Sequence, residues 1–142
     1  MSMNTDTAKR YFELMDDPDT GTEQVLKLYA DNAIVRSPRK GTIRGKEDIE
    51  AFYDANADFF TGGQHVMEAF HEDGNVVICE GTLDGETVEG RTFEGIGLVD
   101  IMRFDDDGKI EEFRAYLDYS AILTEVQENP PSFRDDIPTP EQ

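Results

Sequence analysis

The sequence predicts an α+β fold in which three N-terminal helices pack on a curved, mostly antiparallel sheet and form a cone with it. Two observations predict this arrangement. Apolar residues recur at helical spacing in the first 60 residues, and they alternate with polar residues along several segments of the second half. The length of 142 residues suits one domain with a core of its own.

The first half contains the predicted helices. A helix that ends near Asp16 carries apolar side chains on one face, and these are Ala8, Tyr11, Leu14 and Met15. A second helix begins at Thr22 and includes Tyr29. Residues 33–35 are expected to form a strand and residues 37–45 a loop. A third helix covers residues 46–60, with apolar residues at helical spacing, namely Ile49, Phe52, Tyr53 and Ala57.

The second half is predicted to be a meander of antiparallel strands. Turns are expected at residues 72–75, 84–85 and 105–108, where Asp, Asn and Gly gather. The strands between them are expected over residues 65–71, 76–83, 91–104 and 110–117. A helical turn within residues 120–126 ends a domain of residues 1–126, and residues 127–142 are expected to form a mobile, Pro-rich acidic tail.

The charge balance limits the partners of the protein. The chain has 32 acidic and 13 basic residues, a net charge of −19, so nucleic acid and anionic membrane surfaces are poor partners. No apolar run approaches the roughly 18 residues of a membrane span, and the N-terminus lacks a signal-peptide core, so a cytoplasmic location is expected. Asp outnumbers Glu and Arg outnumbers Lys, a balance that resembles proteins of salt-loving microbes.

Asp100 is the most informative residue. It lies within Gly97–Phe104, a run that otherwise predicts a buried strand. A carboxyl group there must be paired, reach water, or keep its proton. If protonated, it could donate a hydrogen bond to an enolate oxygen. The alternative is a structural acid bonded to a backbone amide, to Arg103 or to Arg114. Arg103 is a weak partner because it points to the other sheet face.

Four stretches carry a family resemblance: residues 10–14 (RYFEL), 28–35 (LYADNAIV), 45–53 (GKEDIEAFY) and 99–110 (VDIMRFDDDGKI). Together they cover most of residues 8–123. They resemble the ketosteroid isomerases within the broader NTF2-like and SnoaL-like superfamily. The resemblance implies a cone-shaped fold and a reaction that brings a steroid double bond into conjugation with a carbonyl group. In that reaction a carboxylate moves the proton, while a tyrosine and a protonated aspartic acid hold the dienolate oxygen.

The resemblance also implies roles for single residues. The oxygen-binding tyrosine falls on Tyr11 and the oxygen-binding acid on Asp100, while the supporting tyrosines fall on Tyr29 and Tyr53. For each tyrosine, ordinary packing with a satisfied hydroxyl is the alternative. The general base of the family falls on Ser37, where a neutral hydroxyl cannot accept a carbon-bound proton without a base of its own.

Other residues could supply the missing base. Glu80 is a weak surrogate, placed on the inner face by strand parity, although a charge on the rim or outer face is the simpler interpretation. His65 and His71 are six residues apart and are therefore expected to point to the same side of one strand. Metal and cofactor sites are not expected, because residues 105–108 lack a calcium-binding loop and no phosphate-binding glycine motif is present.

The sequence therefore predicts an apolar pocket with a polar end made by Tyr11 and Asp100. Its expected lining is Phe12, Met15, Tyr29, Val35, Phe52, Tyr53, Leu98, Phe113, Ala115 and Leu117. Two functions remain open: an enolising isomerase of the steroid delta-isomerase type, or a non-catalytic binder of a small apolar ligand with a carbonyl or phenol group. A hydrolase or cyclase of the superfamily is a weaker alternative. The resemblance further implies a homodimer that forms through the outer sheet face.

Overall fold

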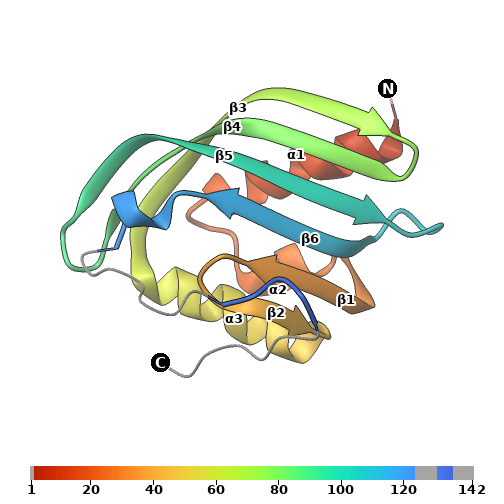
Figure 1. Ribbon diagram of the computed structural model, residues 1–142, viewed down its shortest axis with the longest axis horizontal. Helices are drawn as coiled ribbons and strands as arrows, with labels where there is room; N and C mark the ends of the chain where they lie inside the picture. Colours follow the sequence, from red (N-terminus) through yellow and green to blue (C-terminus); the bar gives the residue numbers. More distant parts are fainter. Residues whose placement is uncertain (1, 124–130, 136–142) are drawn as a thin grey trace.

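The structure is a computed structural model that describes residues 2–123 and 131–135. Its centre is a curved six-stranded sheet with the order β2-β1-β6-β5-β4-β3, and the helices cover one face of it (Figure 1). Only the neighbours β1 and β6 run parallel; the other four neighbouring pairs are antiparallel. The prediction of an α+β cone with a mostly antiparallel sheet is confirmed.

Three helices lie on the inner face. Helix α1 (Met3–Asp16) begins after Ser2, whose Oγ accepts the backbone N–H groups of Asn4 and Thr5. Its buried residues Ala8, Tyr11 and Phe12 share one helical face. Helix α2 (Thr22–Leu26) is short. Helix α3 (Lys46–Phe59) buries Ile49 and Tyr53, one turn apart, against the sheet.

The strands are β1 (Tyr29–Ser37), β2 (Gly41–Arg44), β3 (Phe60–Asp73), β4 (Val76–Thr87), β5 (Thr92–Phe104) and β6 (Ile110–Leu117). A short 3₁₀ turn, η1 (Tyr119–Ala121), follows β6. Along β5, Leu98, Asp100 and Met102 are buried on the inner face, and Arg103 is exposed. Among residues 2–123 and 131–135, no helix is long and apolar enough to cross a membrane.

Four predicted boundaries are wrong. Tyr29 begins β1 rather than continuing the second helix, and the predicted loop of residues 37–45 contains β2. The strand predicted over residues 65–71 begins too late, because β3 starts at Phe60 and includes Gly62 and Gly63. The turn expected at Asp84–Gly85 is strand, because these residues pair with β3 and Gly85 also pairs with Phe93 of β5. Long-range ladders override the local turn preference of Asp-Gly there.

The C-terminal segment of residues 131–135 lies against β1, β2 and β6. Arg36 Nη1 donates to the carbonyl oxygen of Phe133 and lies 3.1 Å from Asp135 Oδ1, while Arg44 Nη2 lies 2.7 Å from Asp135 Oδ2. The Phe133 ring packs on Tyr116 with a centroid distance of 5.5 Å. These residues fall within the predicted tail of residues 127–142, most of which lies outside the described residues, as do 124–126 of the predicted helical turn.

Gly81 is required where β4 passes β3. A Cβ atom on Gly81 would lie 2.5 Å from the carbonyl oxygen of Val66 and 2.9 Å from the Cα atom of Met67. We expect Gly81→Ala to lower the free energy of unfolding by about 1–3 kcal/mol, because backbone must move to relieve the overlap. Urea unfolding measures this. Gly97→Ala, across the ladder with nothing within 4 Å of its Cβ, is the control and should cost clearly less; equal losses would contradict the steric account.

Candidate functional site

Three buried tyrosines form a hydrogen-bonded chain across the inner face. Tyr11 Oη lies 2.8 Å from Tyr53 Oη, and Tyr53 Oη lies 2.6 Å from Tyr29 Oη. Tyr11 comes from α1, Tyr53 from α3 and Tyr29 from the start of β1, and none is more than 4% exposed. Burial raises the pKa of all three phenols well above 10.0, so they remain neutral. These are the three tyrosines to which the family resemblance assigns roles at the oxygen site.

The chain of hydroxyl groups has one donor to spare. Three phenols carry three protons, and the two hydrogen bonds between them use two. One proton therefore remains for a further acceptor. If Tyr29 donates to Tyr53 and Tyr53 to Tyr11, the spare proton lies on Tyr11, and the aligned bonds strengthen it as a donor.

Asp100 lies in the same region of the inner face. In the sheet it is opposite Cys79 of β4 and Ala115 of β6, and it is 5% exposed. Burial raises its pKa from 3.8 to about 7, and the charge of His65 opposes this rise. Its charge in turn raises the pKa of Tyr11, behind the larger effects of burial and Tyr29. The carboxyl group can therefore be either acid or base near neutral pH.

The Asp100 carboxyl group is not fully enclosed. No residue within 2–123 or 131–135 forms a hydrogen bond or an ion pair with it. In the same part of the chain, every fully enclosed side-chain oxygen has a hydrogen-bond partner. The Asp100 oxygens must therefore border space that a water molecule can enter. A ligand oxygen could use the same approach.

Ser37 lies in the same row of the sheet but is committed to a turn. Because β1 and β6 pair in parallel through Arg36 and Arg114, the next step places Ser37 beside Ala115, which is opposite Asp100. Two strand spacings of about 4.8 Å separate Ser37 from Asp100. The Ser37 Oγ accepts the backbone N–H groups of Arg39 and Lys40 at 3.2 and 3.3 Å. It holds the β1–β2 turn, and no side chain within residues 2–123 or 131–135 accepts a hydrogen bond from it.

Glu80 lies on the opposite side of the sheet from Asp100. Its side chain is 51% exposed, and its Oε2 lies 2.6 Å from Nε2 of His71. Its neighbour Cys79, which faces inward opposite Asp100, is fully buried. Glu80 is therefore the charge on the outer face that was the simpler interpretation, and its inward placement by strand parity is wrong.

The two histidines also point to opposite sides, contrary to prediction. A β-bulge between Met67 and Ala69 shifts the alternation of β3 by one residue. His71 therefore faces outward beside Glu80, and His65 faces the helices. The His65 ring lies 5.1 Å from the ring of Phe12, measured between centroids, and its Nδ1 lies 2.6 Å from Oδ1 of Asp16.

The sequence analysis missed Asp16 and Tyr119 as site residues. Tyr119 is close enough for Asp100 to raise its pKa, although burial has the larger effect. Strand alternation could not have placed it, because β6 ends at Leu117 and Tyr119 begins η1. No signal in the sequence indicates the pairing of Asp16 with His65 either.

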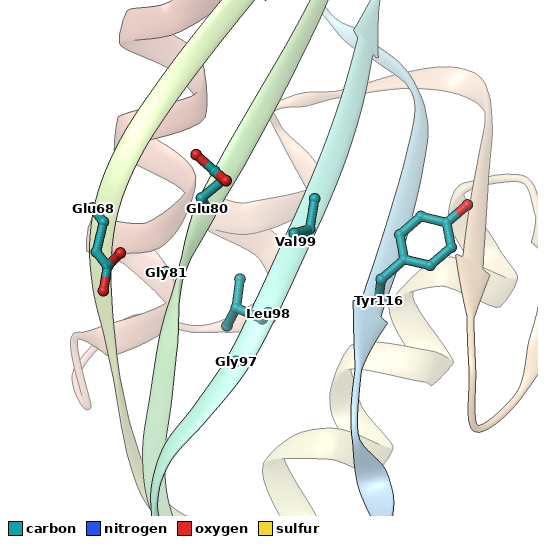
Figure 2. A pocket seen from close by; sticks show the side chains of 7 residues that line it. All are labelled: Glu68, Glu80, Gly81, Gly97, Leu98, Val99 and Tyr116. Carbon is teal, nitrogen blue, oxygen red and sulfur yellow. The ribbon is translucent and has the colours of Figure 1, made fainter.

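The residues predicted to line a pocket form much of the hydrophobic core. Members of the core or packed against it are Phe12, Met15, Tyr29, Val35, Phe52, Tyr53, Phe113 and Ala115. Leu98 is buried and Leu117 partly buried. A hollow of about 280 Å³ lies instead over the outer face of β3 to β6, where Glu68, Glu80 and Tyr116 border it (Figure 2). The side chains predicted to line a pocket thus pack against one another and against the core in this structure.

Several solved structures resemble this one. An NTF2-like protein of unknown function from Burkholderia pseudomallei matches with a TM-score of 0.77 and 22% identity, over 86% of this chain and 95% of that chain. TerC, co-crystallized with polyporic acid, matches with a TM-score of 0.73 and 22% identity, over 85% and 95%. A protein from Catenulispora acidiphila with a ketosteroid isomerase-like fold, in complex with trimethylamine, matches with a TM-score of 0.73 and 14% identity, over 82% and 88%.

Identities this low show the fold alone. The sequence itself gives the family, because the family model of the SnoaL-like domain matches residues 8–113. That range runs from the middle of α1 into β6 and contains the tyrosine chain, Ser37, His65 and Asp100. The protein belongs to the SnoaL-like domain family, and its fold is NTF2-like.

Proposed function

We propose that the protein is an enolising isomerase of the ketosteroid-isomerase type, acting on a small, flat, largely apolar molecule with a carbonyl oxygen. The observation that carries this proposal is the chain of Tyr29, Tyr53 and Tyr11 beside a buried Asp100 that has no ion-pair partner among the described residues. Such a site offers two neutral hydrogen-bond donors, Tyr11 and protonated Asp100, to one ligand oxygen. Donors of this kind stabilise an enolate more than its parent ketone.

Access for the ligand requires core side chains to move. Met15, Phe52 and Ala115 are only partly buried where they pack against the core, so the inner face reaches the surface beside them. Methionine changes its shape at low cost, and a ligand can select a more open arrangement. Related folds accommodate small molecules, as the complexes with polyporic acid and trimethylamine indicate.

A second candidate is a non-catalytic binder with the same ligand chemistry. One specific observation favours it: the family position of the base is Ser37, whose Oγ is occupied by two backbone amides. The binder would hydrogen-bond a carbonyl or phenol oxygen through Tyr11 and Asp100 without transferring a proton. The two candidates share the oxygen site and differ in turnover.

The oxygen site is tested with equilenin, a flat phenol whose fluorescence reports binding. Tyr11→Phe and Asp100→Ala should each raise the Kd about ten-fold or more, because each removes a hydrogen-bond donor to a charged or charge-developing oxygen. Binding should weaken as the pH rises through about 7, where Asp100 loses the proton that it donates. Tyr116→Phe on the exposed outer face is the control. Equal affinities for all variants would reject the site.

We also propose that the protein forms a homodimer through the outer face of the sheet. Val66 and Tyr116 are large side chains exposed on that face, at 47% and 41%. Ile78 and Ile101, paired between β4 and β5, add half-buried apolar surface to it. An apolar face of this kind is suited to a self-complementary contact.

A further inference from the structure

A histidine and an aspartate are joined on the helix-covered face beside the proposed oxygen site. His65 Nδ1 lies 2.6 Å from Asp16 Oδ1. Both carboxylate oxygens of Asp16 also lie 3.0 Å from the backbone nitrogen of His65. The two side chains are only 15% and 25% exposed. Asp16 thus holds both the backbone and the ring of His65 in a partly buried position.

The bond fixes which ring nitrogen carries the proton. A carboxylate only accepts hydrogen bonds, so the Nδ1 atom of His65 must donate to Asp16. In the neutral ring, Nε2 then carries the lone pair. Within residues 2–123 and 131–135, no group forms a hydrogen bond with Nε2. A base with a free lone pair, oriented by a third group, is the arrangement that activates protons or nucleophiles in many enzymes.

The pair is close to the oxygen site. The ring of His65 packs on Phe12, at 5.1 Å between centroids, and Phe12 follows Tyr11 in α1 and lies 5.1 Å from its ring. His65 faces the helices from β3 and Asp100 is buried on the same face from β5, and a positive charge on His65 would lower the pKa of Asp100. The sequence does not predict that His65 lies near the oxygen site, because His65 faces the helices only as a result of the bulge in β3.

We propose that His65 is the general base of this site, taking the role that the neutral Ser37 cannot perform, and that Asp16 is a positioning residue that fixes the His65 tautomer. The inference rests on the proposed function, because it requires an enolisable ligand whose oxygen lies at Tyr11 and Asp100.

The proton transfer balances without a further reactant. Nε2 of His65 takes a proton from the carbon between the carbonyl group and the double bond of the ligand. The C–H electron pair becomes part of the dienolate, and the carbonyl π pair moves to the oxygen that Tyr11 and protonated Asp100 hold. His65 then returns the proton to the far carbon, which leaves the double bond conjugated. Asp16 stays ionised and stabilises the imidazolium formed between these steps.

The test compares the parent with His65→Asn and His71→Asn. An asparagine amide can still donate to Asp16 from about the place of Nδ1 but has nothing at the place of Nε2. His71 is a matched control, because its ring also lies 2.6 Å from a carboxylate, Glu80, but on the outer face. Isomerisation of 5-androstene-3,17-dione and equilenin affinity are measured for each protein. We expect His65→Asn to lower turnover about 10²–10⁴-fold with unchanged phenol affinity, and His71→Asn to change neither.

Because the His65→Asn variant could fail to fold, ¹⁵N NMR of the parent protein provides a second, independent test. The chain has two histidines, so each ¹⁵N signal can be assigned by comparison with His71→Asn. The Nδ1–H tautomer is expected for His65, and equilenin should shift its Nε2 signal and leave His71 unchanged. For the positioning role, Asp16→Asn should lower kcat with little change in KM, since the amide still accepts the backbone N–H.

The outcomes separate the inference from the proposed function. If the parent turns over and His65→Asn is equally fast, or if the Nε2 signal ignores the ligand, His65 is not the base and the oxygen site stands. If equilenin binds through Tyr11 and Asp100 but the parent does not turn over, the base role is rejected and the binder remains. If the Tyr11 and Asp100 variants bind equilenin as tightly as the parent does, the proposed function is wrong, and so is the inference that rests on it.

Discussion

Replacing Asp100 with asparagine is expected to make the protein more stable above pH 7, by about 4 kcal/mol in the pH-dependent part of the free energy of unfolding. Burial raises the pKa of Asp100 from 3.8 to about 7, so the folded protein binds this proton more tightly than the unfolded chain does. Stability from this group is therefore complete below the unfolded pKa and is lost as the pH rises to about 7. Asparagine cannot ionise and avoids the loss.

The experiment is urea unfolding of the parent and Asp100→Asn at intervals between pH 5 and pH 8, a window in which about 3 kcal/mol of the effect should appear because the rest is already lost below pH 5. The advantage of the variant should grow with pH and level off above about 7. A contribution to the stability difference that does not depend on pH, such as the packing of the amide group, cancels when values at different pH are compared. Asp106→Asn, in an exposed turn, removes the same charge from a chain of net charge −19 and controls for general repulsion. Parallel curves for parent and Asp100→Asn would show that Asp100 is not a buried neutral acid.

Local sequence patterns predicted a helix or strand correctly where its packing partners in the fold favour the same structure. The strand of residues 110–117 matches β6, and the third helix differs from α3 by one residue. The prediction failed where a distant partner decides the structure. Asp84–Gly85 has strong local turn character, yet Gly85 lies in the sheet because β3 and β5 pair with it on both sides. A strand as short as β2 carries too few residues for alternation to be visible.

The site divides in a similar way. Family resemblance pointed to Tyr11, Tyr29, Tyr53 and Asp100, and alternation along β5 was enough to place Asp100 on the inner face. The orientation of His65 could not be predicted, because one extra residue in β3 reverses the side to which it points. The bulge has no glycine or other marker between Met67 and Ala69. One extra residue that the sequence does not mark therefore decides whether His65 points to the surface or to the inner face.

Tyr53→Phe is expected to cost about 2–4 kcal/mol of stability, the largest loss among the three tyrosines. Tyr53 is the central member of the chain, bonded to Tyr11 at 2.8 Å and to Tyr29 at 2.6 Å. Removing its hydroxyl leaves two other buried hydroxyls without that partner, whereas Tyr29→Phe removes one bond and leaves Tyr53 paired with Tyr11. The aromatic contacts of Tyr53 with Tyr11, Tyr29 and Phe52 are kept by the phenylalanine ring.

Urea unfolding at constant slope measures these losses, and a double-mutant cycle assigns them. If the hydroxyls act together, the double variant Tyr29→Phe/Tyr53→Phe should lose less stability than the sum of the losses of the two single variants. Both substitutions remove the same hydrogen bond. Strict additivity would mean that the Tyr29 and Tyr53 hydroxyls act independently. In that case the strength of Tyr11 as a donor to a ligand oxygen could not depend on Tyr29 at the far end of the three hydroxyls.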